Sequence, residues 1–417
     1  MNDRSIICID LKSFFASVEC VERGLDPFKV SLVVADPSRG GGAITLAATP
    51  YLKSFGVPSR GRVYTLPKNI NIIFAPPRMS LYIKASKEVI KIYLKYISEE
   101  DMHIYSIDEV FLDVTDYLKL YKTTAYDLAY KIMNDVKSSL GLTSTCGIGP
   151  NLLLAKVAMD IEAKHTKDNI AYWTKDDIKT KLWEITPLSK MWGIGNAMEK
   201  KLNDLGIYKI GDINKYDISF YKKRFGIMGE ELWEHANGID NSSIKEEKAQ
   251  VKGKTYGMSQ VLFKDYTINN IPLIIREMTS ILVKRLRDNK KTCSLVSFGI
   301  SYSKAVGGGY YHSKTLPTDT DSETIIYNEF EDIFKTFTED LPIRKVSISV
   351  GKLKDKSHLQ LNLFEDVIIK EKEDNLSEFI DDINDKYGKN SILKASSLMD
   401  DSTIHERNKK IGGHTST

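Results

Sequence analysis

The sequence predicts a multidomain α+β protein. Its 417 residues suggest roughly two to four domains, and a composition of 42% hydrophobic and 28% charged residues is typical of a chain that buries cores. Residues 1–170 mix short apolar strands with helical patterns, whereas residues 171–240 read as all-helical and carry all four tryptophans. Residues 255–352 follow the order strand, helix, strand, strand, helix, strand, which is typical of a split βαβ, ferredoxin-like domain.

Particular elements support this division of the N-terminal region. Residues 26–76 are rich in Gly and Pro and are expected to form a small inserted subdomain. Helical patterns follow at about 80–97 and 123–140. The charged, low-aliphatic run 241–254 predicts a linker between domains.

The ferredoxin-like region contains a residue that marks the start of a helix and patterns that indicate strands. Its first helix is expected to begin near Pro272, a favoured first-turn residue. The strands near 295–302 and 346–350 alternate as half-buried strands do. After residue 353 the chain turns polar, with one amphipathic patch at 376–383 that either binds a partner or packs on the body.

Composition excludes some classes of protein. The net charge is only +3, from 59 basic against 56 acidic residues, so overall charge argues neither for nor against nucleic acid. Four widely spaced cysteines without a CxxC pair predict buried or incidental thiols and no zinc site. No signal peptide and no apolar run of membrane-spanning length is recognisable, so we expect a cytoplasmic protein.

Two neighbouring acids interrupt an otherwise apolar, alternating strand pattern. Asp108 and Glu109 stand at a bend within residues 104–113, and the short apolar run 5–10 ends on a third acid, Asp10. Buried charges need a partner or a cation. Three carboxylates from two strands suit Mg²⁺, which prefers hard oxygen ligands. From the residues alone, a pair of surface acids at a hairpin turn stays open as the alternative.

A helix pattern opens directly after Asp10 and begins with two aromatic residues, Phe14 and Phe15. Rings one turn past a metal-binding carboxylate would lie over whatever the metal holds. With the Ser-Ile-Asp-Glu sequence at 106–109, these features resemble the Y-family (translesion) DNA polymerases, and the UmuC-type branch fits best. The resemblance covers most of the chain and includes several separate motifs.

The resemblance implies a right-hand polymerase with palm, fingers, helical thumb and ferredoxin-like little finger. The expected boundaries are residues 1–25 and 77–170 for the palm, 26–76 for the fingers, 171–240 for a thumb with a helix-hairpin-helix, 241–254 for the linker, 255–353 for the little finger and 354–417 for a C-terminal tail.

The resemblance also assigns the residues of a two-metal active site. Asp10, Asp108 and Glu109 would be catalytic and, together with Leu11, would hold two Mg²⁺ ions. One ion would activate the primer hydroxyl and the other would hold the leaving diphosphate.

Nucleotide-binding residues follow from the same comparison of motifs. Phe15 would lie under the sugar of the incoming dNTP and exclude a 2′-hydroxyl, with Phe14 packed beneath it. Lys53 and Lys164 would contact the triphosphate. Plain core packing for the rings and a solvated face for the lysines remain the alternatives.

A glycine-punctuated pattern at 191–202 predicts a helix-hairpin-helix that binds the DNA backbone. Gly193 and Gly195 would let the main chain approach a phosphate, and Lys200 lies on the following helix. The alternative is an ordinary turn between antiparallel helices.

A basic cluster near the end of the first little-finger helix is a second expected DNA contact. It includes Lys284, Arg285 and Arg287. Basic residues are also common at helix C-termini because they complement the helix dipole, so that alternative stays open.

A short peptide after the last predicted strand resembles the bacterial peptide that binds the sliding clamp (the beta subunit). Gln360 would supply a polar hook, and Leu361, Leu363 and Phe364 would supply apolar side chains for a groove. Relatives in this branch can also require UmuD-type and RecA proteins as partners.

The expected function is template-directed, low-fidelity DNA synthesis past damaged bases, within an SOS-type DNA-damage response, on primer-template DNA with dNTPs. Low fidelity is implied by the resemblance alone. Two alternatives remain: a catalytically inactive subunit that binds DNA and the clamp, and a metal-dependent nuclease.

Overall fold

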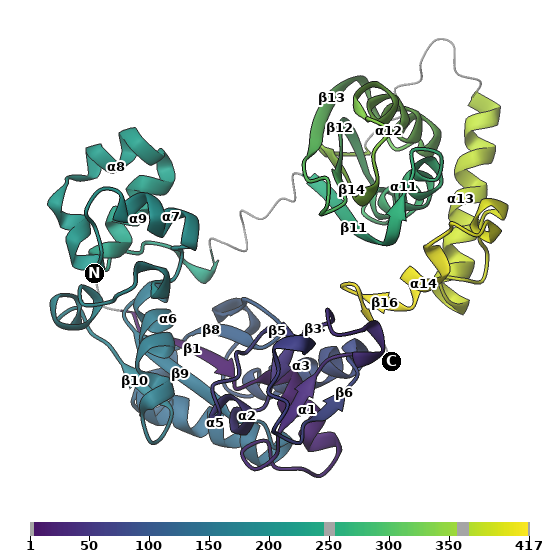
Figure 1. The fold of residues 1–417 in the computed structure, drawn as a ribbon. Helices are drawn as coiled ribbons and strands as arrows, with labels where there is room; N and C mark the ends of the chain where they lie inside the picture. Colours follow the sequence, from purple (N-terminus) through teal and green to yellow (C-terminus); the bar gives the residue numbers. More distant parts are fainter. Residues whose placement is uncertain (1–3, 246–254, 357–366, 416–417) are drawn as a thin grey trace. The chain divides into compact units, whose positions relative to one another are not determined.

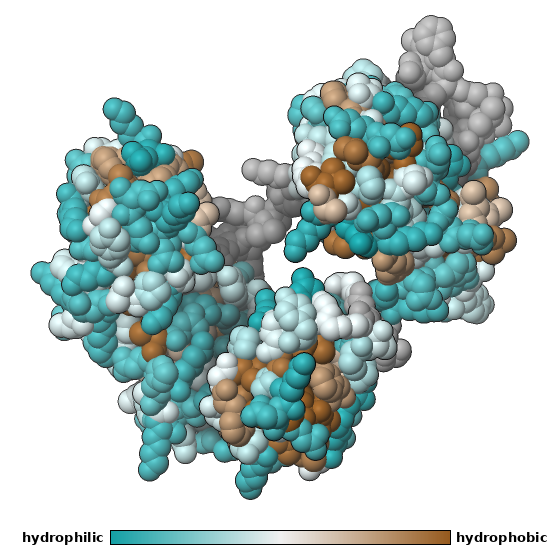
Figure 2. Space-filling model, viewed as in Figure 1, coloured by the Kyte–Doolittle hydropathy of each residue, from teal (hydrophilic) through white to brown (hydrophobic). Residues whose placement is uncertain are grey.

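The computed structural model describes residues 4–245, 255–356 and 367–415. The chain divides into two compact units, one of Met1–Val251 with His414–Thr417 and one of Lys252–Gly413 (Figure 1). Each unit contains a β-sheet with helices packed on it, which confirms the predicted α+β class. Hydrophilic side chains cover most of the surface that Figure 2 shows, with smaller apolar patches between them.

The first unit is built around a five-stranded sheet of order β10-β9-β1-β8-β7. The central strand, β1, is antiparallel to both β8 and β9. The strands are β1 (Ile6–Leu11), β7 (Met102–Ile104), β8 (Glu109–Asp113), β9 (Ser144–Gly149) and β10 (Ile170–Tyr172).

The alternation of side chains along β1 separates two cores. Ile7 and Ile9 face a large core that includes side chains of α1, α3 and α5. Ile6 and Cys8 face the other side, where α6 packs. Because strand side chains alternate with a period of two, Asp10 continues the row of Ile6 and Cys8 on the α6 side. The helices are α1 (Phe14–Glu22), α3 (Met79–Tyr93), α4 (Thr115–Tyr121), α5 (Ala125–Leu140) and α6 (Leu152–Ile161).

Helix α6 lies unusually close to β9. A Cβ atom added to Gly147 would stand 2.0 Å from the carbonyl oxygen of Ala155 and 2.4 Å from the backbone nitrogen of Met159. Only a residue without a side chain allows this approach. Lys156 of the same helix pairs with Glu109, which lies opposite Asp10.

Residues 30–75 form two small sheets beside the large one. β2 pairs with β4 and with β6, and β3 pairs with β5. The elements are β2 (Leu32–Val34), β3 (Ile44–Thr45), β4 (Ala47–Ala48), α2 (Pro50–Lys53), β5 (Gly61–Arg62) and β6 (Ile73–Ala75).

A helical region with its own apolar core follows the sheet. The all-helical prediction from residue 171 is wrong at its start, because β10 extends to Tyr172 and pairs in parallel with β9. The strand was missed because three residues give too little pattern to recognise. The helices are α7 (Asn196–Asn203), α8 (Ile218–Phe225) and α9 (Ile227–Ala236).

The second unit has the predicted strand-helix-strand-strand-helix-strand order. Its sheet has the order β11-β14-β12-β13, so one strand of the other half separates the two strands of each βαβ half. This confirms the split ferredoxin-like prediction. The elements are β11 (Thr255–Tyr266), α11 (Ile271–Asp288), β12 (Lys291–Tyr302), β13 (Gly309–Thr320), α12 (Glu323–Phe337), β14 (Ile343–Gly351) and β15 (Lys354–Asp355).

Helix α13 and residues 402–403 contact α11. Asp381 of α13 pairs with Arg287 at 2.7 Å, while Leu376 and Phe379 of the same helix stay about 60% exposed. The amphipathic patch therefore packs on the body and also presents apolar side chains outward. The elements are α13 (Val367–Tyr387), α14 (Ile404–Asn408), β16 (Lys410–Ile411) and β17 (His414–Thr415).

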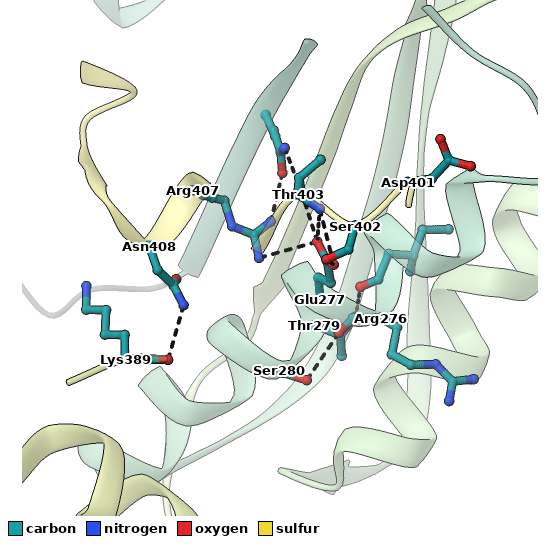
Figure 3. Close-up of polar contacts among 12 residues, drawn as sticks. Arg276, Glu277, Thr279, Ser280, Lys389, Asp401, Ser402, Thr403, Arg407 and Asn408 are labelled. Carbon is teal, nitrogen blue, oxygen red and sulfur yellow. Dashed lines mark hydrogen bonds and ion pairs between the residues drawn. The ribbon is translucent and has the colours of Figure 1, made fainter. Parts of the chain in front are cut away.

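A buried carboxylate on α11 anchors this C-terminal segment (Figure 3). Glu277, only 4% exposed, accepts hydrogen bonds from Ser402 Oγ at 2.5 Å and from Thr403 Oγ1 at 2.9 Å. The backbone N–H of Thr403 also donates to it. A buried charge is tolerated because several donors surround it.

Two expectations from composition can be compared with the fold. The four cysteines are buried and free, as predicted. Within the part of the chain that the structure describes, no helix is both long and apolar enough to cross a bilayer.

Candidate active site

The end of β1 brings together the three acids that the sequence predicted. Asp10 lies directly opposite Glu109 in the β1–β8 ladder. Asp108 occupies the turn before β8, where its carbonyl accepts the N–H of Leu11 at 3.0 Å. Ser106 Oγ donates to the Asp108 carboxylate at 2.6 Å and orients it. The β7–β8 hairpin and the central strand β1 thus place three carboxylates at the same end of the sheet.

The acids repel one another. Burial, followed by the charges of Asp108 and Glu109, raises the pKa of Asp10 from 3.8 to about 7. Lys164 and Lys156 act in the opposite direction but do not outweigh these effects. Such crowding of negative charge favours a bound cation.

A cavity of about 430 Å³ opens beside these acids. Asp10, Leu11 and Asp108 line one part of it, and basic side chains line another. The side chain of Leu11 is buried, so this residue can offer only its backbone oxygen. Carboxylate and carbonyl oxygens are the hard donors that divalent cations prefer, so this lining fits a metal ion.

Glu109 is placed differently from its two partners. Its carboxylate does not line the cavity; Lys156 Nζ of α6 binds it at 2.8 Å, and Cys8 Sγ donates to it at 3.4 Å. Across the described ranges, no group of three or more His, Cys, Asp or Glu side chains is arranged to hold a metal ion. The structure therefore brings Glu109 close to the other acids without turning it toward the cavity.

The predicted phosphate-binding lysines both reach the cavity. Lys53 ends α2, and burial lowers its pKa. Lys164 is 46% exposed and pairs with Asp160 at 3.1 Å. Two further cations line the cavity and were not predicted, Lys12 and Arg60. Lys12 could have been found from its position two residues after Asp10, whereas nothing in the loop around Arg60 indicated its direction.

The two aromatic residues have different environments. Phe14 is 2% exposed and belongs to the core, although both residues are among those that line the cavity. Phe15 stacks on Tyr82, with ring centroids 4.7 Å apart and planes 28° apart. Tyr82 is fully buried and donates its hydroxyl proton to Glu19 at 2.8 Å. A fixed tyrosine thus supports Phe15, and the sequence did not reveal it.

The predicted helix-hairpin-helix glycines are exposed at the start of α7. Gly193 has a φ of +89°, which favours glycine, and Gly195 is the N-cap residue of α7. Within the described part of the chain, and apart from the adjoining residues, no heavy atom lies within 4 Å of a Cβ built on either glycine. Lys200 is exposed on the same helix. The backbone here is open to a phosphate.

The predicted basic cluster of the second unit is already paired. Lys284 binds Asp385 at 2.9 Å, and Arg287 binds Asp381 at 2.7 Å. Arg285 is exposed, with its guanidinium over the ring of Tyr256. Acids of α13 thus neutralise two of the three cations that were expected to contact DNA.

The predicted clamp-binding peptide lies outside the described residues. This concerns Gln360, Leu361, Leu363 and Phe364. Its assignment stays a prediction from sequence.

The chain is similar to known proteins along nearly its whole length. Residues 9–160 match the impB/mucB/samB family, residues 253–363 match the C-terminal domain of that family, and residues 175–207 match the IMS family HHH motif. "Putative UV-damage repair protein UvrX" of Bacillus subtilis (strain 168) is 38% identical, over 99% of this chain and 98% of its own. DNA polymerase IV 2 of the same strain is 32% identical over 99% of both chains.

A solved structure shows the same fold. The Y-family DNA polymerase chimera Dbh-Dpo4(243-245)-Dbh superposes with a TM-score of 0.68 at 20% identity, over 84% of this chain and 99% of the chimera. With the two Bacillus relatives matched nearly end to end, the chain belongs to the impB/mucB/samB family, the Y-family of DNA polymerases.

Proposed function

We propose that the protein is a DNA-directed DNA polymerase that extends a primer on damaged templates with low fidelity and releases pyrophosphate. The observation that carries this proposal is the cavity beside β1, which is lined by carboxylates, by an aromatic ring and by lysines. A triphosphate, its cations and a sugar need these three kinds of surface. The relatives named as DNA polymerase IV support the same activity.

Asp10 and Asp108 would hold two Mg²⁺ ions, with the backbone carbonyl of Leu11 as a further ligand and Glu109 completing the site. Bound magnesium would supply activation of the primer hydroxyl and stabilise charge on the leaving diphosphate. The protein's own contribution is to keep these oxygen donors on a rigid sheet edge. Asp10 and Asp108 then orient the reacting groups for in-line transfer.

Nucleotide selection would rest on other residues that line the cavity. Phe15, held by Tyr82, would meet the sugar and exclude a 2′-hydroxyl, with Phe14 fixing the helix behind it. Lys53 and Lys164 would bind the triphosphate oxygens.

DNA would bind through Gly193, Gly195 and Lys200, where backbone N–H groups and a helix N-terminus attract a phosphate. Lys284, Arg285 and Arg287 are weaker candidates, because α13 occupies two of them.

The peptide at 360–364 would tether the enzyme to the sliding clamp in the cytoplasm and raise its effective concentration at primer ends. UmuD-type and RecA proteins would join it in an SOS-type response.

Primer extension with the full-length chain and Mg²⁺ tests this function. The wild type should lengthen a labelled primer, and Asp108→Ala should lose incorporation by about a thousand-fold or more while keeping its affinity for DNA. Asp116→Ala, at an exposed carboxylate of α4, is the matched control and should extend normally. Shortening of the primer would favour a nuclease, and a wild type that binds DNA without extending it would favour an accessory subunit.

A further inference from the structure

A chain of ion pairs connects Glu109 to Lys164, which lines the cavity. Lys156 binds Glu109 at 2.8 Å and Asp160 at 3.0 Å, and Lys164 binds the other oxygen of Asp160 at 3.1 Å. Lys156, Asp160 and Lys164 are spaced four residues apart along α6 and the turn after it, so they lie on one face. Lys164 lines the cavity, and Glu109 lies beside it.

The inner pair of this chain is well shielded from water. The side chains of Lys156 and Glu109 are each only 10% exposed. Removing one partner of a buried pair leaves a costly bare charge. Glu109 can therefore leave Lys156 only if another carboxylate compensates the lysine.

Asp160 is that carboxylate, and Lys164 controls its availability. In the structure Asp160 is shared between two lysines. A Lys164 that paired with a triphosphate would leave both oxygens of Asp160 available to Lys156. Glu109 would then be able to rotate toward Asp10 and Asp108.

We propose that Glu109, Lys156, Asp160 and Lys164 form an ion-pair relay that completes the metal site only when a nucleotide triphosphate is bound. The inference rests on the proposed function and assigns Lys156 and Asp160 as positioning residues for Glu109. It explains why two of the three acids line the cavity while the third is held aside.

The relay is tested by Mn²⁺ binding to the nucleotide-free protein, followed by electron paramagnetic resonance of the free ion. Lys156→Met should release Glu109 and lower the Kd for Mn²⁺ by about ten-fold, equivalent to about 1.4 kcal/mol. Lys164→Gln, at a side chain that is 46% exposed, should also lower the Kd because Asp160 is then left to Lys156. Lys156→Arg keeps the pair and should leave the Kd within about two-fold.

The Glu109→Gln background separates the relay from general charge effects. If the lysines act mainly through Glu109, Lys156→Met and Lys164→Gln should lower the Mn²⁺ Kd by no more than about three-fold in this background, the remaining change being the direct effect of each lysine's charge on Asp10. The same Kd decrease with and without Glu109, or no decrease in either, overturns the relay. Lys181→Met is the matched control, because Lys181 bridges Glu162 and Asp177 and is not among the cavity-lining residues.

Failure of the relay can be told from failure of the proposed function. The Mn²⁺ measurement needs neither DNA nor turnover, and primer extension by the wild type is measured beside it. If the wild type extends a primer normally but the lysine substitutions do not act on the Mn²⁺ Kd through Glu109, only the relay is wrong. If they do act through Glu109 but the wild type does not extend a primer, only the polymerase assignment is wrong.

Discussion

Neutralising Asp10 should stabilise the metal-free protein at neutral and alkaline pH. Asp10→Asn keeps the shape of the side chain and removes the charge that burial and the neighbouring acids disfavour. Because the pKa of Asp10 is higher in the folded chain than in the unfolded chain, the folded state binds more protons between the two values. Stability of the wild type therefore falls as pH rises from about 4 to about 7.

The size of the effect follows from the pKa values. Asp10 rises from 3.8 to about 7, and each unit corresponds to 1.36 kcal/mol. The stability difference between Asp10→Asn and the wild type should therefore grow by up to about 4 kcal/mol between pH 4 and pH 8 and stay constant above that.

Urea unfolding in EDTA, followed by tryptophan fluorescence, measures this difference. All four tryptophans belong to the first unit, so the signal reports the unit that contains Asp10. Adding Mn²⁺ at pH 8 should stabilise the wild type more than the variant. Free energies of unfolding that stay parallel within about 0.5 kcal/mol across the pH range would refute the proposed crowding of charge.

Three further predictions concern packing and selectivity. Glu277→Ala strands the buried donors of Thr403 and should destabilise the second unit by about 3–5 kcal/mol, measured by urea unfolding with circular dichroism; a loss below about 1 kcal/mol contradicts the anchor. Gly147→Ala forces a methyl group against the carbonyl of Ala155 and should lower the free energy of unfolding by about 3 kcal/mol. An unchanged free energy of unfolding, measured by tryptophan fluorescence, would show that α6 can move away from β9 at little cost. Phe15→Ala should raise incorporation of rNTP relative to dNTP by about ten-fold or more in single-turnover assays, and an unchanged ratio rejects its role against the 2′-hydroxyl.

The ferredoxin-like unit could be predicted from local signals. Pro272 lies in the first turn of α11, and the alternating strands are found where the pattern placed them. These signals are carried within each element. The order of strands in the sheet is a long-range property, which local patterns of residues do not encode.

The basic cluster shows that local sequence patterns do not reveal which distant residues pair with a helix face. Lys284 and Arg287 were recognised as a charged helix end, but their partners Asp385 and Asp381 follow about a hundred residues later. Helical periodicity identifies a face and does not say which segment covers it.

In the active site, too, neighbouring residues in the sequence did not reveal where each side chain points. Asp108 and Glu109 are neighbours in sequence, yet Asp108 lines the cavity and Glu109 turns to Lys156. Two adjacent acids at a turn lie at the same place in the fold, but their side chains can point in different directions. The four-residue spacing of Lys156, Asp160 and Lys164 was a readable signal, but only the fold shows that it meets Glu109.

The most direct test of the account is anomalous diffraction from crystals of the protein with primer-template DNA, a non-reactive dNTP analogue and Mn²⁺. We expect anomalous peaks between the carboxylates of Asp10 and Asp108, with Glu109 turned away from Lys156 and toward the metal. Manganese bound elsewhere, with both aspartates free of it, would contradict the claim that these acids form the catalytic centre.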